Sequence, residues 1–187
     1  MTPSDAASSP NPDVLVLFQG AGWQARWLGE DDLPAIEAVL EASREFLELV
    51  SGIAEIPGEA QSLLTELPQG TTLRDKLSIG ITTEPDGLIG LLDVIRDYPQ
   101  PRTWWIGLLL FRPEWRGRGL GRQALDAIER LARQAGAANI ELGVVEPNQA
   151  GLLFWQRMGF EAIERRLSRR FGIREQAIIV MRKALPE

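Results

Sequence analysis

Cysteine and histidine are both absent from the 187-residue sequence. Without cysteine the chain can form no disulfide, no thiolate nucleophile and no zinc–sulfur site. Without histidine it can form neither a Ser-His-Asp triad nor a metal site with an imidazole ligand. No D-x-D-x-D-G loop occurs either, so we expect no bound metal. Any general base must therefore be a carboxylate, a water that a carboxylate orients, or a backbone carbonyl.

Long apolar runs are also missing. No stretch approaches the roughly 18 residues of a membrane-spanning helix, and the opening segment, MTPSDAASSPNPD, lacks the basic and apolar parts of a signal peptide. We therefore expect a cytoplasmic protein that does not associate with membranes. A hydrophobic content of 44% with 25% charged residues is typical of a globular chain. We expect a disordered tail at residues 1–12 and a single domain over residues 13–187.

Charge is unevenly distributed along the chain. Residues 1–99 hold 17 acidic and 5 basic side chains, whereas residues 100–187 hold 9 acidic and 15 basic ones. The sequence pI of about 4.9 argues against nucleic acid as a partner. An acidic half that faces a ligand site would attract a cationic amine. The alternative is that these charges are ordinary solvated surface.

Hydrophobic periodicity predicts a mixed α/β domain without internal repeats. Strands are predicted at Trp23–Leu28, Lys76–Thr82, Leu88–Ile95, Thr103–Phe111, Asn139–Val145, Glu161–Ser168 and Gln176–Lys183. Helices are predicted from Leu33 up to Gly52, at Gly58–Leu67, from Leu120 to Ala135, and at Gln149–Met158. The short apolar run Val14–Phe18 is either a further strand or a packed leader.

The stretch from Phe111 to Ala135, FRPEWRGRGLGRQALDAIERLARQA, joins a predicted strand to an amphipathic helix through a glycine-rich loop. Glycine lets backbone N–H groups approach a phosphate closely, and the unpaired amides of a helix's first turn carry about half a positive charge. Arginines in the loop add charge-assisted hydrogen bonds. The sequence therefore predicts a pyrophosphate site at this loop.

Two well-known phosphate loops compete for this stretch. A P-loop requires Gly-Lys-Ser/Thr, but Gly121 is followed by Arg122-Gln123. The dinucleotide fingerprint G-x-G-x-x-G/A matches at Gly119, Gly121 and Ala124, and Glu141 lies near the expected ribose-binding distance. That fingerprint should follow its strand directly, yet Arg112 to Arg118 intervene. It stays open as the weaker alternative.

Two motifs resemble the GNAT superfamily of acyl-CoA-dependent N-acyltransferases. Arg116-Gly117-Arg118-Gly119-Leu120-Gly121 fits the family's R/Q-x-x-G-x-G/A loop, and NQAGLLFWQRMGF at Asn148–Phe160 resembles its second block. The resemblance covers about residues 23–187. It implies an α/β (α+β) fold with a mixed, mostly antiparallel sheet of about six or seven strands and helices on both faces. It also implies a pair of strands that splay apart around the acyl-pantetheine arm.

The resemblance further implies which residues bind the cofactor. The backbone of Leu109 and Phe111 is expected to pair with the pantetheine amides. Asn148 looks like the family's asparagine near the pantetheine, and it is equally suited to cap the following helix. Trp155 stands where the family often has a tyrosine that protonates the departing thiolate; an indole N–H is too weak an acid, which leaves this step to water. The pyrophosphate is expected to contact Arg116, Gly117, Arg118, Gly119, Leu120, Gly121 and the amide of Arg122.

An amine acceptor would need a base. An alkyl amine has a pKa near 10, so exposing its lone pair at neutral pH costs about 4 kcal/mol. Asp93 interrupts the apolar strand LIGLLDVI and could orient a water at the acceptor. The alternative is that Asp93 pairs with an arginine or lies on the solvent side of its strand. Glu146, at the end of a later strand, is the second candidate.

These features and the resemblance together imply an N-acetyltransferase. It would move acetyl from acetyl-CoA, a cosubstrate, to a primary amine by direct attack in a ternary complex. The acceptor would be a small-molecule or peptide amine, and the sequence allows a homodimer. Two alternatives stay open, namely a non-catalytic acyl-CoA-binding domain and a dinucleotide-binding oxidoreductase.

Overall fold

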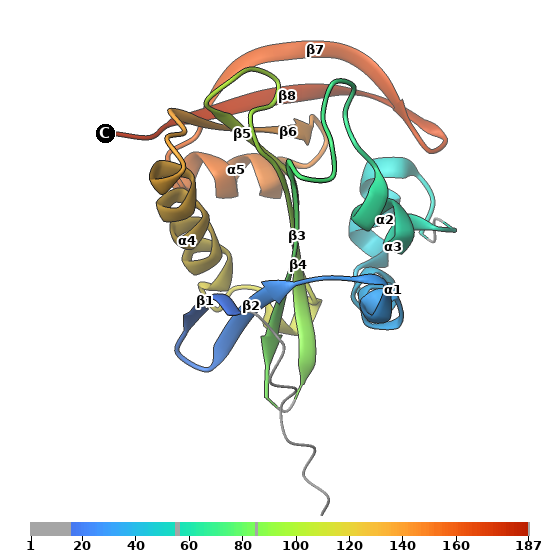
Figure 1. Cartoon of the computed structure of the whole chain (residues 1–187). Coiled ribbons are helices and arrows are strands. Elements are labelled where there is room, and N and C mark those ends of the chain that lie inside the picture. Colours follow the sequence, from blue (N-terminus) through green and yellow to red (C-terminus); the bar gives the residue numbers. More distant parts are fainter. Residues whose placement is uncertain (1–15, 55–56, 85, 187) are drawn as a thin grey trace, which may run out of the picture.

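A computed structural model describes residues 16–54, 57–84 and 86–186. One eight-stranded sheet has the strand order β1-β2-β3-β4-β5-β6-β8-β7. Helices α1, α2 and α3 lie on one side of the sheet, and α4 and α5 lie on the other (Figure 1). This arrangement confirms the predicted mixed α/β fold with a mostly antiparallel sheet. The predicted disordered tail, residues 1–12, lies outside the described residues.

The sheet has eight strands, one more than the upper limit of the prediction. The additional strand is β1, because the apolar run near residue 16 pairs with β2 instead of forming a packed leader. The strands are β1 Val16–Gly20, β2 Trp23–Trp27, β3 Lys76–Thr83, β4 Gly87–Ile95, β5 Thr103–Phe111, β6 Asn139–Val145, β7 Glu161–Phe171 and β8 Arg174–Ala184. The α-helices are α1 Leu33–Ala42, α2 Arg44–Ser51, α3 Glu59–Thr65, α4 Leu120–Gln134 and α5 Gln149–Arg157.

The single helix predicted from Leu33 up to Gly52 is in fact two helices that meet at Ser43. The apolar periodicity continues across the junction, so the pattern alone gave no sign of a break. Ser43 has a non-helical backbone (φ −110°, ψ 26°) and is 1% exposed. Serine favours such breaks because its hydroxyl can hydrogen-bond to nearby groups in non-helical conformations, which compete with the helical one.

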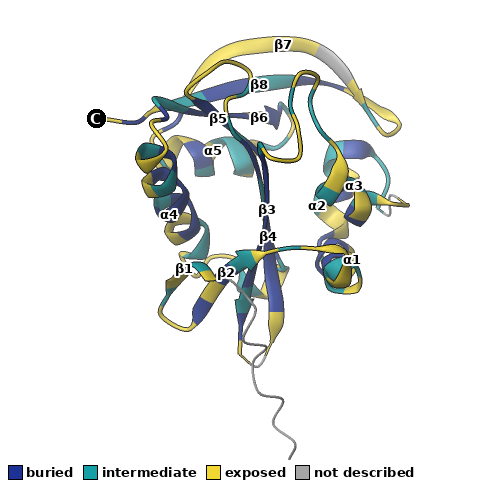
Figure 2. Cartoon of the chain, viewed as in Figure 1, coloured by how far each residue is buried: buried dark blue, intermediate teal, exposed yellow. Residues whose placement is uncertain are grey.

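The central strands are buried on both faces, as Figure 2 shows for β3 and β4. In β4, Leu91 packs with Ile36 and Val39 of α1, whereas Leu92 packs on the opposite face with the cluster that includes Leu125 of α4. A strand covered by helices on both sides needs a continuous apolar run, not an alternating one. This explains why Asp93 is conspicuous within β4.

Strands β5 and β6 are parallel and pair only over their first halves, from Thr103↔Asn139 to Ile106↔Leu142. Beyond this point β5 stays with β4 as far as Phe111, while β6 continues with β8 as far as Val145. The two neighbouring strands therefore part. This is the splayed pair that the fold prediction included.

The hairpin of β7 and β8 arches from this end of the sheet across to α2 (Figure 1). Its tip is attached to the end of α2, because Ile173 N donates to Ser51 O at 2.9 Å and Gln176 Nε2 donates to Leu49 O at 3.1 Å. The hairpin thereby extends from β6, the neighbour of β8 in the sheet, to the end of α2.

Candidate active site

The glycine-rich loop presents backbone amides at the start of α4. Gly117 (φ +72°) and Gly119 (φ +79°) both adopt the left-handed conformation that favours glycine. In the described part of the chain, the amides of Gly117, Arg118 and Gly119 donate to no backbone acceptor. The first-turn amides of α4, from Leu120 to Arg122, have no carbonyl four residues earlier within the helix. Such a set of amides at a helix N-terminus suits an anion.

Gly121 has a packing role within the same loop. A Cβ at this position would lie 3.1 Å from Cζ of Phe154 in α5. Glycine at this position therefore lets the Phe154 ring of α5 lie close to the start of α4. Gly117 and Gly119 are thus needed for their backbone conformation, whereas Gly121 is needed because a side chain there would crowd Phe154.

The three arginines of the loop differ in their contacts. Arg116 turns inward, where its Nε donates to Phe111 O at 2.8 Å and its Nη2 donates to Ser43 Oγ at 3.1 Å. Arg118 lies over the Trp115 ring at 4.6 Å. The Arg122 side chain is 72% exposed. Arg118 and Arg122 can therefore reach an anion in solvent, whereas the Arg116 guanidinium fastens the loop to the protein.

Backbone groups of β5 point into the gap left by β6. Arg112 N donates to Ile89 O, so this pair of residues is hydrogen-bonded across β5 and β4. Counting back by two along β5, Leu110 and Leu108 occupy the other hydrogen-bonded positions, opposite Leu91 and Asp93. Because antiparallel pairs alternate between bonded and non-bonded, the N–H and C=O groups of Leu109 and Phe111 point away from β4. The Phe111 carbonyl accepts from Arg116. The side chains of both residues pack into the core.

Asn148 and Trp155 lie at the two ends of α5. Asn148 is the N-cap, and its Oδ1 accepts a hydrogen bond from Gly151 N at 2.9 Å, which confirms the predicted cap. Trp155 is 8% exposed and stacks edge-on against Phe154 and Phe160, at 4.9 and 5.1 Å between ring centroids. Its ring is part of the hydrophobic core.

Asp93 lies on the α1–α3 side of the sheet, in an ion pair that the sequence did not identify. Its Oδ1 is 2.7 Å from Lys76 Nζ, and the side chains are 15% and 4% exposed. Its partner is thus a lysine, not the arginine considered above. Burial raises the pKa of the Asp93 carboxyl; Lys76 opposes this effect, and Glu66 at the end of α3 adds to it. In the β3–β4 register Asp93 pairs with Ser78, and Lys76 lies two residues away along β3, so the sequence pattern did not connect the two charges.

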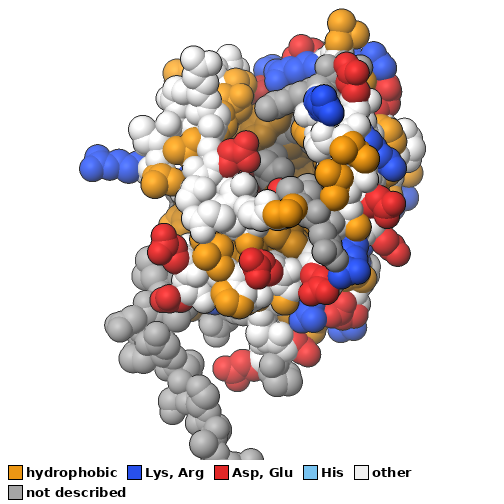
Figure 3. All heavy atoms as spheres, turned by 90° about the vertical axis from the view of Figure 1, so that its right-hand side faces the viewer, with side chains coloured by type: hydrophobic (Ala, Val, Ile, Leu, Met, Phe, Trp, Pro, Cys, Tyr) orange, Lys and Arg blue, Asp and Glu red, His pale blue; other side chains and the backbone are white. Residues whose placement is uncertain are grey.

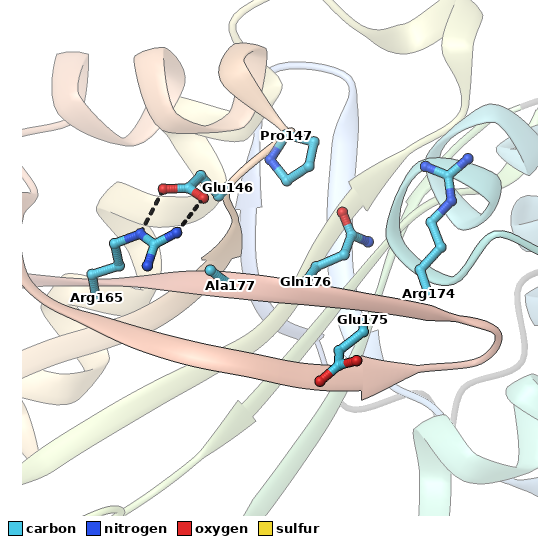
Figure 4. A pocket seen from close by; sticks show the side chains of 7 residues that line it. All are labelled: Glu146, Pro147, Arg165, Arg174, Glu175, Gln176 and Ala177. Atoms are coloured by element: carbon cyan, nitrogen blue, oxygen red, sulfur yellow. Dashed lines mark hydrogen bonds and ion pairs between the residues drawn. The ribbon is translucent and has the colours of Figure 1, made fainter.

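Glu146 follows β6 and lines an open pocket of about 430 Å³ under the hairpin. Arg165 donates to both of its carboxylate oxygens at 2.7 Å, and this hydrogen bonding lowers the pKa of Glu146. Figure 4 shows that Arg165 and Glu146 point toward each other from one side of the pocket, while Arg174 reaches toward α2 on the other. Sequence patterns could not reveal Arg165, Arg174 or Gln176 as lining residues, because only the folded hairpin brings them here.

Part of the acidic half of the sequence is exposed on α1 and α2, where Glu37, Glu41, Glu45 and Glu48 all face solvent. Figure 3 shows acidic side chains, with basic ones among them, spread over the face that α1–α3 cover. Among the described residues no three acidic side chains converge as metal ligands would. No helix in the described ranges is long and apolar enough to cross a bilayer.

The dinucleotide alternative does not agree with this structure. Such a fold needs a parallel sheet built from successive βα units, whereas β5 and β6 form the only parallel pair among the described strands. Glu141, considered above as a ribose ligand, is 2% exposed and its Oε1 lies 2.7 Å from Arg182 Nη2. Its carboxylate is therefore engaged within the protein.

The family model described as "Acetyltransferase (GNAT) family" matches residues 45–160. An acetyltransferase from Thermus thermophilus is similar in fold, with a TM-score of 0.68, 21% identity, and coverage of 91% of this chain and 100% of that one. Spermidine N-acetyltransferase from Vibrio cholerae, solved with CoA and spermine, has a TM-score of 0.68 at 16% identity, covering 89% and 97%.

The ribosomal-protein-S18-alanine N-acetyltransferase from Escherichia coli is also similar, with a TM-score of 0.62 at 16% identity, covering 88% of this chain and 95% of that one. A comparison with curated proteins finds no match. At these identities the solved structures support the fold, and the family model carries the assignment.

Proposed function

The chain belongs to the GNAT acetyltransferase family, and from that premise we propose that it transfers acetyl from acetyl-CoA to a primary amine by direct attack in a ternary complex. The observation that carries the proposal is the position of the loop amides, at the end of the strand that parts from its neighbour. An anionic group held there would leave the attached chain free to enter the gap between β5 and β6.

We assign cofactor binding to the loop and to β5. The amides from Gly117 to Arg122 would hold the diphosphate of acetyl-CoA, assisted by the side chains of Arg118 and Arg122. The pantetheine would pair with the outward-pointing backbone groups of Leu109 and with the N–H of Phe111. Asn148 would contribute indirectly, by fixing the start of α5. Trp155 would form part of the packed wall behind the site.

We assign the general base to Asp93 in preference to Glu146. A base must hold a proton part of the time, which favours a carboxyl whose pKa is raised over one whose pKa is lowered. Asp93 would accept a proton from the acceptor ammonium, directly or through water. The amine nitrogen then attacks the thioester carbonyl carbon and the C–S bond breaks. The second nitrogen proton reaches the departing thiolate by way of water, since Trp155 cannot supply it.

The acceptor class follows from charge. The exposed acidic side chains of α1 and α2 would concentrate a cationic amine near the site. The similar structures named above act on spermidine and on a protein alanine, so both a small-molecule and a peptide amine fit the proposal. The cytoplasmic location and the homodimer stay predictions.

The experiment measures free thiol released from acetyl-CoA with spermidine and with an alanine-initiated peptide as acceptors. We expect thiol release that depends on at least one amine. Asp93→Asn should lower kcat by about 100-fold or more, the usual contribution of a general base, whereas Glu146→Gln should change it less than about threefold. If the protein binds CoA but no amine makes it release free thiol from acetyl-CoA, the result would instead favour the non-catalytic acyl-CoA-binding alternative.

A further inference from the structure

Gly107 occupies an unusual position in β5. It is the bulged residue opposite β4, because Ile106 pairs with Val94 and Leu108 pairs with Asp93. It is also the first residue after the last β5–β6 pair, Ile106↔Leu142. Its backbone is exposed although its neighbour Ile106 is buried. The strand thus opens to solvent at the point where the splayed gap begins.

The Asp93 carboxylate lies directly against Gly107. A Cβ on this glycine would be 2.7 Å from Asp93 Oδ2, closer than real Cβ atoms approach another heavy atom. The other oxygen, Oδ1, is 2.7 Å from Lys76 Nζ. The two contacts divide the carboxylate: one oxygen is bound to a buried cation, and the other faces a residue without a side chain.

We propose that Gly107 is a positioning residue for acetyl transfer. Its missing side chain leaves a window through which Oδ2 of Asp93 reaches the acceptor nitrogen in the gap between β5 and β6. Lys76 holds Oδ1 and so keeps Oδ2 directed at that window. The inference rests on the proposed function, and it adds a steric requirement at residue 107 that the proposed function does not contain.

Lys76 also has an electrostatic effect on the base. The charged groups that face Asp93 are Lys76 from β3 and Glu66 from the end of α3, while β5 presents Gly107 and Leu108. The ammonium favours the ionised carboxylate, so its removal raises the pKa of Asp93. In Lys76→Met the acid limb of the kcat/KM profile should therefore move to higher pH. A lysine that only packs in the core would leave this limb in place.

The first test is Gly107→Ala, with Gly29→Ala as its matched control. The three atoms nearest to the added methyl group of Gly107→Ala all belong to the Asp93 side chain and none to the backbone, so the variant displaces that side chain and the fold should persist. Gly29 has an extended φ of −133° and nothing within 4 Å of an added Cβ. We expect Gly107→Ala to lower kcat by at least about tenfold, part of the usual contribution of a base. Its dissociation constant for CoA, measured by calorimetry, should be unchanged, and Gly29→Ala should match the wild type in both.

The second test repeats Gly107→Ala in an Asp93→Asn background. If the glycine acts through the carboxylate, the additional loss should be smaller than about twofold, because coupled residues are not additive. Full activity in Gly107→Ala, or an undiminished loss in the double variant, overturns the inference while the proposed function stands. Wild-type protein that releases no thiol with any amine overturns the proposed function first. An unmoved acid limb in Lys76→Met refutes the role given to the lysine.

Discussion

Arg116 and Ser43 are hydrogen-bonded across 73 residues of sequence, with Nη2 and Oγ 3.1 Å apart. Ser43 is the buried junction of α1 and α2, and Arg116 begins the loop that precedes α4. The same guanidinium donates to the carbonyl of Phe111 at the end of β5. One side chain therefore connects the loop, the splayed strand and the helices on the opposite face of the sheet. The proposed cofactor site and acceptor site share this connection.

Replacing Arg116 with methionine should destabilise the protein. Two hydrogen bonds from a charged donor are lost and a buried hydroxyl loses its donor, which together cost about 1–3 kcal/mol. Urea unfolding measures this cost. Arg122→Met is the matched control, because that side chain is 72% exposed, and it should change stability by less than about 0.5 kcal/mol. Equal stability of the two variants would show that the hydrogen bonds of Arg116 to Phe111 and Ser43 contribute nothing to stability.

Gly119→Glu should abolish CoA binding, and Gly136→Glu should not. The two glycines flank the opposite ends of α4 with φ values of +79° and +80°, and a Cβ at either meets nothing closer than 4.0 Å. Backbone strain is therefore matched, and only the position of the new carboxylate differs. We expect a loss of at least about 100-fold in affinity at residue 119, about 2.8 kcal/mol, and a loss below about twofold at residue 136. Calorimetric titration with CoA decides, and similar losses in both variants would contradict the site.

Acid stability should depend on Asp32. Its carboxylate accepts from Arg26 Nη2 at 2.6 Å and Nη1 at 2.9 Å, and this hydrogen bonding lowers the pKa of Asp32. A carboxyl whose folded pKa is depressed stabilises the fold above its unfolded pKa of about 3.9, and this contribution disappears as pH falls through the folded value. Asp32→Asn should therefore cost about 1–2 kcal/mol at neutral pH.

The same cost should shrink once the pH is well below about 3.9. Unfolding in urea at a series of pH values measures both parts of the prediction. Asp31→Asn, at the exposed neighbouring residue, is the control and should have little effect at any pH. A cost that stays constant down to the lowest pH would show that the pair is not ionic in the folded state.

Local patterns predicted the loop and the fold class well. The order strand, glycine loop, amphipathic helix is encoded within the stretch from Phe111 to Ala135, so no distant residue is needed to interpret it. The N-cap at Asn148 was predictable for the same reason, since its partner Gly151 is three residues away. The break at Ser43 was not predictable, because the apolar periodicity continues across it and the partner of its hydroxyl, Arg116, lies far along the chain.

The surroundings of the two candidate bases show the same limit. Asp93 was identified by its position within an apolar strand, but its environment depends on Lys76 from β3 and on the bulge at Gly107. Glu146 was identified by its position at the end of a strand, and it was the fold that brought Arg165 to it. The raised pKa of one carboxyl and the lowered pKa of the other follow from these tertiary contacts. A one-dimensional pattern does not contain them.

The tip of the β7–β8 hairpin should control access of the acceptor. Gly172 has φ +55°, and a Cβ there would lie 2.7 Å from the backbone oxygen of Ser51, which cannot move aside as a side chain would. Gly172→Ala should therefore separate the tip from α2 and widen the pocket that Arg174 and Gln176 line. We expect a higher KM for the amine with an unchanged dissociation constant for CoA, because the loop at α4 is not touched.

Gly87→Ala is the matched control for that hairpin variant. Gly87, the first residue of β4, also has a positive φ, +67°, but nothing lies within 4 Å of its added Cβ. Both variants carry about 1–2 kcal/mol of backbone strain, so unfolding measurements should show a loss in each, larger at Gly172 because of the clash. Steady-state kinetics with the best acceptor then separate strain from access. If the KM for the amine rises equally in both variants, or in neither, the hairpin does not border the acceptor path, and the pocket beside Glu146 is only a surface depression.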